Sequence, residues 1–168
     1  MRALVLWLDA HSSTVWLGAQ DLLLGLQSQE GECVDLAASR SNLYPKRLMN
    51  DLSIVIVTWN SEDCIADCLR SIYESIADLT LEVFVVDNES TDGTAGVVES
   101  AFPQVHLIRN AANFGFARAT NQGLAVATGR YMLLLNPDTV VQKEALPRMV
   151  EFMDSNPRVG SLGPQLLN

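Results

Sequence analysis

Residues 53–62, Ser-Ile-Val-Ile-Val-Thr-Trp-Asn-Ser-Glu, contain a strand signal followed directly by a helix signal. The first six residues are largely apolar and β-branched, which is typical of a strand buried on both faces. The sequence then changes to polar residues, and Ser61 stands where a helix N-cap would stand. Because apolar residues recur at helical spacing as far as residue 76, the segment predicts a strand followed by a helix.

The same strand–helix unit recurs through residues 51–168. Further strands are predicted at residues 81–86, 105–108, 131–135 and 159–162. Further helices are predicted through residues 97–98, over 114–127 and around 146–153. This alternation predicts an α/β fold of the Rossmann-like kind, in which a mostly parallel sheet carries helices on both faces.

Residues 1–50 have a different character. A leucine-rich stretch at residues 22–26 has helical potential that Gly25 interrupts, and the stretch around Pro45 reads as a linker. We therefore divide the chain into an extension of uncertain structure (1–50) and an α/β domain (51–168). No window contains eighteen uninterrupted apolar residues, so the sequence predicts no transmembrane helix.

The chain is acidic, with 20 Asp and Glu against 11 Lys and Arg. Nucleic-acid-binding proteins need a basic face, so the composition argues against nucleic acid as a partner. A phosphate-bearing ligand is still compatible, because metal ions or backbone N–H groups hold phosphate without surplus lysine. Three cysteines without framework spacing indicate reduced thiols in the cytoplasm, and Cys64 and Cys68 favour apolar packing over a metal pair.

Polar residues follow the first four predicted strands at their carboxyl ends. They occupy residues 58–62, 87–93, 109–115 and 136–138. The carboxyl ends of parallel strands lie at one edge of a sheet, and ligands of open α/β sheets bind in the crevice outside that edge. We therefore expect these residues to meet in one site.

The side chains at these strand ends are compatible with a nucleoside diphosphate and a metal ion. Asp87 is an acceptor suited to a pyrimidine N–H or a ribose hydroxyl, and Trp59 supplies apolar area beside it. Gly115 lets a backbone approach closely. Asp138 is an oxygen ligand of the type that Mg²⁺ or Mn²⁺ prefers, and such ions are usually held by one or two carboxylates plus substrate phosphates.

Each of these residues also has a structural explanation when taken alone. Asp138 would serve as a helix cap, Asp87 as an Asx-turn, and Trp59 equally well as core. Arg118 is as well suited to a solvated helix face as to a phosphate contact. A receiver-type signalling domain needs an acidic pair after the first strand, and a dinucleotide-binding oxidoreductase needs G-x-G-x-x-G there; the chain has neither.

Four motifs in order carry a resemblance to a known family: SIVIVTWNSE (53–62), VVDNESTDGT (85–94), NFGFARATNQG (113–123) and LLLNPDTVV (133–141). Together they resemble the first half of a family 2 glycosyltransferase with the GT-A fold, close to its rhamnosyltransferase-like branch. The resemblance covers residues 53–168 and none of residues 1–50.

The resemblance implies inverting, metal-assisted transfer from a nucleotide-sugar donor to a saccharide or lipid-linked acceptor of the cell envelope. The enzyme would work in the cytoplasm or peripherally at the inner face of the membrane. Asn136-Pro-Asp138 corresponds to the family's Asp-X-Asp motif, in which Asp138 would coordinate Mg²⁺ or Mn²⁺ on the diphosphate. The resemblance assigns donor-binding roles to nine residues, and the apolar ring of Trp59 adds a tenth. The expected donor-binding residues are therefore Thr58, Trp59, Asn60, Glu62, Asp87, Asn88, Ser90, Asn113, Gly115 and Asn121.

Two departures from the family pattern bear on activity. Asn136 replaces the first carboxylate of the metal motif, and an amide oxygen is the weaker cation ligand. The chain also ends at Asn168, before the family's acceptor-binding half, so we expect the general base to lie beyond it. The alternative hypothesis is therefore a catalytically incompetent fragment that only binds a nucleotide or nucleotide sugar. A truncated sheet would also expose an edge for self-association.

Overall fold

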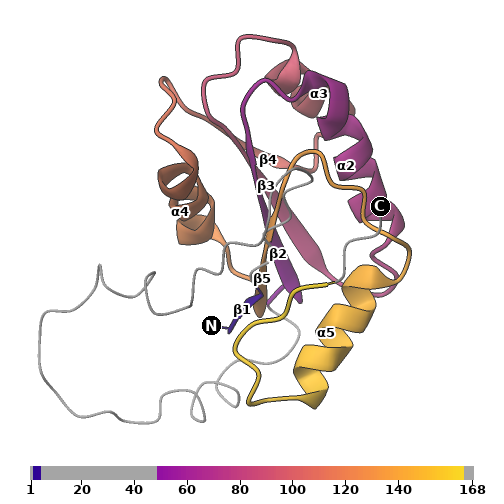
Figure 1. Ribbon diagram of the computed structural model, residues 1–168. Coiled ribbons are helices and arrows are strands. Elements are labelled where there is room, and N and C mark those ends of the chain that lie inside the picture. The colour runs from indigo at the N-terminus through magenta and orange to yellow at the C-terminus, as the bar shows by residue number, and fades with distance from the viewer. Residues whose placement is uncertain (1, 5–48, 165–168) are drawn as a thin grey trace, which may run out of the picture. The chain divides into compact units, whose positions relative to one another are not determined.

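The computed structural model describes residues 2–4 and 49–164 (Figure 1). Its strands are β1 (Arg2–Leu4), β2 (Leu52–Thr58), β3 (Leu81–Asp87), β4 (His106–Arg109) and β5 (Tyr131–Leu135). Its helices are α2 (Glu62–Glu74), α3 (Thr94–Ala101), α4 (Phe116–Val126) and α5 (Ala145–Ser155). Among the described helices, none combines the length and apolar character needed to cross a bilayer. The helix considered at residues 22–26 lies outside the described residues.

The strands form one sheet in the order β1-β5-β2-β3-β4, and every neighbouring pair is parallel. β2 lies at the centre, where Thr58 is in register with Asp87 of β3 and Ile56 is in register with Leu135 of β5. This arrangement confirms the predicted parallel α/β fold. It also brings the carboxyl ends of β2, β3, β4 and β5 to one edge, here called the carboxyl edge.

β1 is a strand that the sequence did not predict. Residues Arg2–Leu4, from the segment treated as an extension, pair in parallel with Tyr131–Leu133. The described sheet therefore has β1 and β4 as its outer strands, and β5 lies inside it.

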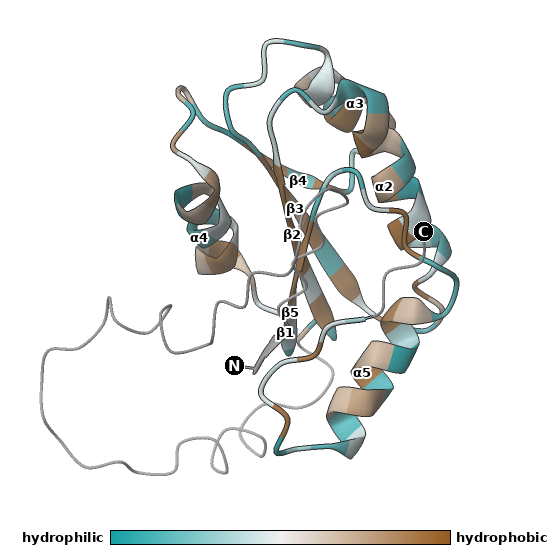
Figure 2. Cartoon of the chain, in the orientation of Figure 1, coloured by the Kyte–Doolittle hydropathy of each residue, from teal (hydrophilic) through white to brown (hydrophobic). Residues whose placement is uncertain are grey.

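Helices cover both faces of the sheet, as predicted (Figure 1). α4 lies on one face, and α2, α3 and α5 lie on the other. Along β2, Ile54 and Ile56 belong to the larger core with α2 and α5, whereas Val55 packs with Ala119 of α4 in the smaller core. The strands are accordingly hydrophobic along much of their length (Figure 2).

α4 packs closely on β2 because one helical position has no side chain. A Cβ on Gly123 would overlap Cγ1 of Val55 and lie 3.1 Å from Cγ2 of the same residue. The glycine thus brings the helix and the strand nearer together than alanine would allow. The start of α4 lies at the carboxyl edge.

The strand predicted at residues 159–162 is wrong. These residues form no strand, and Val159 instead donates its backbone N–H to the carbonyl of Asn156 at 2.9 Å. Val159 and Leu162 are partly buried and pack against the larger core. The short apolar run therefore reflects side-chain burial after a turn and not sheet pairing.

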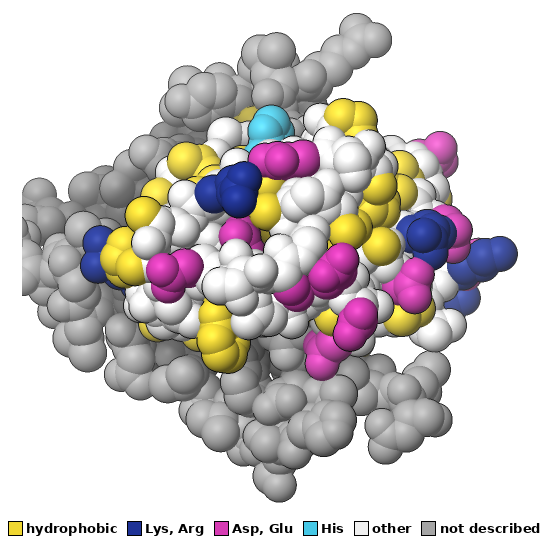
Figure 3. Space-filling model, turned by 90° about the horizontal axis from the view of Figure 1, so that it is seen from above, with side chains coloured by type: hydrophobic (Ala, Val, Ile, Leu, Met, Phe, Trp, Pro, Cys, Tyr) yellow, Lys and Arg dark blue, Asp and Glu magenta, His cyan; other side chains and the backbone are white. Residues whose placement is uncertain are grey.

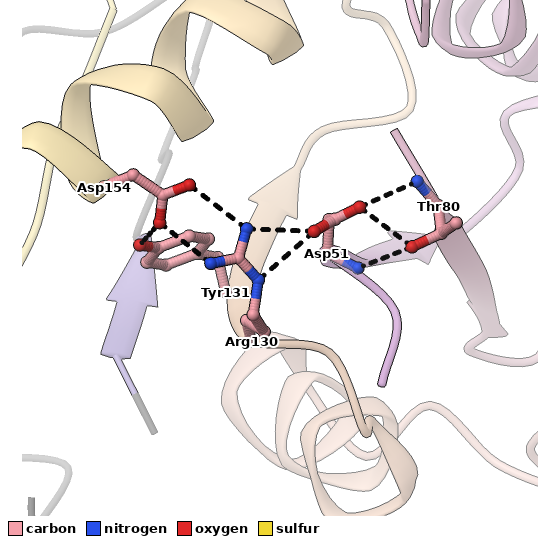
Figure 4. Close-up of polar contacts among 5 residues, drawn as sticks. All are labelled: Asp51, Thr80, Arg130, Tyr131 and Asp154. Carbon is pink, nitrogen blue, oxygen red and sulfur yellow. Dashed lines mark hydrogen bonds and ion pairs between the residues drawn. The ribbon is translucent and has the colours of Figure 1, made fainter. Parts of the chain in front are cut away.

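The amino ends of the strands are joined by a polar network around Arg130 (Figure 4). The guanidinium donates to Asp51 Oδ1 at 2.9 Å and to Asp154 Oδ1 at 2.8 Å, and the Tyr131 hydroxyl donates to Asp154 at 2.7 Å. Thr80 donates its backbone N–H and its hydroxyl to the other oxygen of Asp51. Burial opposes ionisation of Asp51, but hydrogen bonds from Thr80 and Arg130 outweigh it and lower the pKa. The network fastens α5 to the starts of β2 and β5.

Candidate functional site

Asp87 lies at the end of β3, near the middle of the carboxyl edge. Its side chain is almost completely buried, at 2% exposure. One carboxylate oxygen accepts from the Thr58 hydroxyl at 3.3 Å and the other from the backbone N–H of Ser90 at 3.4 Å. The local turn bond considered for Asp87 is thus present. Both bonds are long, and a carboxylate has about four lone-pair sites, so Asp87 retains acceptor capacity.

Side-chain to backbone hydrogen bonds join the loop after β2 to the loop after β3. We call residues 60–62 and 90–94, together with the hydrogen bonds that join them, the loop clasp. Asn60 Oδ1 accepts from the backbone N–H of Thr91 at 2.8 Å, and Glu62 Oε2 accepts from that of Gly93 at 2.8 Å. In the other direction, the Glu62 N–H donates to Asp92 Oδ2 at 3.1 Å. The predicted pocket residues Asn60 and Glu62 therefore brace one loop against the other.

The clasp also caps α2. Ser61 occupies the N-cap position as predicted, but its hydroxyl makes no capping hydrogen bond. Its own backbone N–H donates to the Thr94 hydroxyl at 2.8 Å, and Asp92 receives the N–H of Glu62. The neighbouring loop thus accepts the amides of Ser61 and Glu62, so contacts about thirty residues away in sequence help to fix the helix start.

A second network fixes the loop between β4 and α4. Asn88, 2% exposed, donates from its amide nitrogen to Asn113 Oδ1 at 2.7 Å. Its amide oxygen accepts from the backbone N–H of Phe114 at 3.0 Å and from the Asn110 amide at 3.1 Å. Asn110 and Gln122 exchange two hydrogen bonds of 2.9 Å. Asn88 and Asn113 thereby connect the end of β3 to the start of α4.

Gly115 stands at the N-cap of α4 with φ = 81°. That left-handed conformation, disfavoured for residues that carry a Cβ, is what requires glycine here. No described protein atom lies within 4 Å of the position that a Cβ would take, so the space beside Gly115 is open. Asn121 is exposed farther along α4, outside the network of Asn88 and Asn113.

Aromatic side chains are exposed around the carboxyl edge. Trp59 is 60% exposed, so its alternative interpretation as a core residue is wrong. Phe114 is also exposed, and the Arg118 guanidinium lies over its ring at 4.1 Å from the centroid. A flat ring and a positive charge are thus available to a ligand at this edge.

Asp138 follows β5 and is exposed. The helix-cap explanation for it is wrong, because α5 starts at Ala145 and has Glu144 at its N-cap. Burial and then the charge of Asp138 raise the pKa of the Cys64 thiol in the first turn of α2. The thiol–carbonyl contact of Cys68 with Asn136, at 3.6 Å, joins α2 to the end of β5. Figure 3, which looks onto the molecule from above, shows acidic side chains over the middle of this face.

The carboxyl edge supplies few protein ligands for a cation. Within residues 49–164 and β1, no group of three or more His, Cys, Asp or Glu side chains is arranged to hold a metal ion. Asp138 and Asn136 nevertheless supply oxygen atoms, the donor type that Mg²⁺ and Mn²⁺ prefer. An ion held by this pair would need its remaining ligands from a bound phosphate and water. Cys68 is buried, which raises its pKa to about 12, so the predicted apolar packing of this thiol is confirmed.

The family model of glycosyl transferase family 2 matches residues 53–166. The chain belongs to this family. The match starts inside β2 and runs past α5, so it includes every strand end that contributes to the carboxyl edge. The family 2 domain therefore contains the whole candidate site described above.

Named relatives agree with this assignment. The succinoglycan biosynthesis protein ExoO of Rhizobium meliloti (strain 1021) is 36% identical over 108 residues, which are 62% of this chain and 30% of that protein. S. aureus TarS 1–349 in complex with UDP is 29% identical with a TM-score of 0.58, over 64% of this chain and 33% of that one. The mannosyltransferase PcManGT from Pyrobaculum calidifontis, in complex with GDP-Man and Mn²⁺, is 29% identical with a TM-score of 0.59, over 67% and 34%. The chain thus spans about a third of the length of each of these matched chains.

Sequence reasoning missed several residues that shape the site of this family 2 domain. Asp92 and Thr94 cap α2, Glu89 accepts from the N–H of Asn113 at 2.9 Å, and Asn110 joins Asn88 to Gln122. The one available signal was Thr91-Asp92-Gly93, which reads as ordinary turn chemistry and hides the contact with the preceding loop.

Proposed function

We propose that this family 2 domain binds a nucleotide-activated sugar at its carboxyl edge and serves in transfer of the sugar to a saccharide or lipid-linked acceptor of the cell envelope. The observation that carries the proposal is the position of Asp138, an exposed carboxylate that caps no described helix and lies on the same edge as Asp87. Relatives bound to UDP and to GDP-Man with Mn²⁺ support this class of ligand.

The strand ends divide the proposed pocket into regions. Asp87 would accept from the base, with Asn88 and Ser90 beside it, and the exposed ring of Trp59 would give the base an apolar surface. The remaining residues of the pocket are Thr58, Asn60 and Glu62 behind the first strand, and Asn113, Gly115 and Asn121 on the side of α4. The buried position of Asp87 would limit competition from water for its free acceptor sites.

Asp138, with Asn136, would hold the divalent cation together with the donor phosphates. Once bound, the ion would neutralise negative charge that develops on the leaving diphosphate. Because the protein supplies one carboxylate and one amide, the ion and the nucleotide should bind more tightly together than either does alone.

The resemblance further supports a mechanism in which an acceptor hydroxyl displaces the nucleotide with inversion. It also supports membership of the rhamnosyltransferase-like branch and action at the cytoplasmic face of a membrane. A base is needed within hydrogen-bond reach of that hydroxyl, and we assign none among the described residues. The outer strands β1 and β4 are where self-association through a sheet edge would occur.

Calorimetric titration tests the proposal. The protein would be titrated with UDP, dTDP and GDP, each with and without Mn²⁺, alongside Asp138→Ala and the control Asp78→Ala. Asp78 is an exposed carboxylate in the turn between α2 and β3, at the opposite edge of the sheet. We expect Mn²⁺-dependent binding of at least one nucleotide, loss of the metal dependence in Asp138→Ala and unchanged binding in Asp78→Ala. A folded protein that binds no nucleotide, or an Asp138→Ala variant that binds as before, would refute it.

A further inference from the structure

The loop clasp contains a chain of contacts that leads from Asn60 to Asp87. The backbone N–H of Asn60 donates to the Ser90 hydroxyl at 2.9 Å, and the backbone N–H of Ser90 donates to Asp87 at 3.4 Å. The side chain of Asn60 fixes the next residue of the same loop, because its Oδ1 accepts from the Thr91 N–H at 2.8 Å. Asn60 therefore contacts two successive residues, Ser90 and Thr91, of the loop whose Ser90 N–H donates to Asp87.

Asn60 is itself held in an unusual conformation. Its φ is 52°, in the left-handed region that asparagine tolerates better than most residues with a side chain. This turn directs the amide oxygen of Asn60 at the β3–α3 loop. Because that oxygen also lies 3.4 Å from the Thr91 hydroxyl, its acceptor sites are taken up within the protein.

Glu62 and Asp92 reinforce the same junction. Each carboxylate accepts a backbone N–H from the opposite loop: Glu62 from Gly93 at 2.8 Å and Asp92 from Glu62 at 3.1 Å. A Cβ on Gly93 would collide with the Glu62 carboxylate, so glycine is what admits this contact. The junction is therefore reciprocal, with acceptors and donors on both loops.

We propose that Asn60 is a positioning residue, whose amide oxygen orients the β3–α3 loop and thereby Asp87 for the base, without touching the donor. This inference rests on the proposed function, and it deepens that function by separating a residue that shapes the pocket from those that contact the nucleotide. The alternative is direct contact, in which the Asn60 amide N–H group donates to the base or to the diphosphate.

Two substitutions at Asn60 separate these roles. Asn60→Asp keeps an acceptor oxygen for the Thr91 N–H and tolerates a left-handed φ, but it loses the amide donor and adds a negative charge. Asn60→Gly keeps the backbone conformation and removes the oxygen. Positioning predicts that the aspartate variant binds better than the glycine variant. Direct contact with an anionic donor predicts the reverse, because the added carboxylate repels phosphate.

The experiment combines hydrogen exchange on the free protein with titration of UDP in the presence of Mn²⁺. Ala77→Gly is the control, since Ala77 also has a left-handed φ, of 45°, and lies in the turn after α2 at the other edge. In Asn60→Asp we expect the Thr91 amide to stay protected and UDP affinity to remain within about twofold of the wild type. In Asn60→Gly we expect that protection to be lost and the affinity to fall about threefold to tenfold, the range for one hydrogen bond. Ala77→Gly should leave both unchanged.

The possible failures are distinguishable. If the wild type binds UDP and Asn60→Asp binds no better than Asn60→Gly, the inference is overturned in favour of direct contact. If Asn60→Gly keeps both Thr91 protection and affinity, the clasp does not orient Asp87 and the inference also fails. If the folded wild type binds none of UDP, dTDP and GDP, the proposed function fails. The positioning role of Asn60 then fails as well, because it rests on that function. In that case Thr91 protection still reports whether the loops are joined as described.

Discussion

Replacing Gly123 with alanine tests whether α4 is seated on β2 as closely as the structure shows. The new methyl group would overlap Val55, which is 1% exposed in the smaller core. Valine is stiff at χ1, so Val55 cannot easily turn away. The matched control is Gly96→Ala in α3, where a Cβ would meet no atom within 4 Å.

The expected magnitude comes from two opposing effects. Alanine is favoured over glycine inside a helix by about 0.8–1.0 kcal/mol, and both positions gain this contribution. Only Gly123→Ala also overpacks a core, which costs about 1–3 kcal/mol. We therefore expect Gly96→Ala to raise the free energy of unfolding by up to about 1 kcal/mol, and Gly123→Ala to be less stable than Gly96→Ala by about 1–3 kcal/mol.

Urea unfolding followed by far-ultraviolet circular dichroism measures both variants against the wild type. The double variant Gly123→Ala/Val55→Ala should show a favourable coupling of about 0.5–3 kcal/mol, because the smaller side chain removes the overlap. Equal stabilisation by the two glycine substitutions, or purely additive effects in the double variant, would show that α4 does not approach β2 in this way.

Two further predictions concern titration. The folded protein lowers the pKa of Asp51 below its unfolded-state value of about 3.8. The ionised carboxylate therefore stabilises the fold above about pH 3.8, and this stabilisation is lost as the pH falls through the lower folded pKa. Asp51→Asn should thus destabilise the protein at pH 7 and have progressively less effect towards pH 3 in urea titrations; an effect that does not vary with pH would contradict this account. Burial raises the pKa of both described thiols, that of Cys68 to about 12. Iodoacetamide at pH 8 should therefore modify the part-exposed Cys64 slowly and Cys68 only after unfolding, as peptide mass spectrometry would show; rapid native labelling of Cys68 would show that its burial is wrong.

The sequence predicted the sheet well because its signals are local. Apolar runs mark β2, β3 and β5, and the helices between them require parallel strands. The convergence of Asp87 and Asp138 therefore follows from topology alone. The apolar run at residues 159–162 resembled these strands in sequence. It pairs with no strand, and Val159 and Leu162 instead pack against the larger core.

The details of the site could not be predicted in the same way. The partners of Asn60 and Glu62 lie about thirty residues away, and no local pattern shows which loop residue will receive their hydrogen bonds. β1 escaped prediction for a related reason: three residues are too few for a period, and their partners begin at Tyr131. The sequence therefore predicts which side chains approach the edge better than it predicts which of them remain available to a ligand.

β1 has a practical consequence for anyone who shortens this chain. Because Arg2–Leu4 pair with Tyr131–Leu133, the backbone of β5 has hydrogen-bonding neighbours on both sides. Removing the first four residues would leave one side of β5 unpaired, on the strand that leads directly to Asn136 and Asp138. A protein trimmed to the family-matched residues would then expose an unpaired strand edge. Its aggregation would have to be separated from any loss of binding at the proposed nucleotide site.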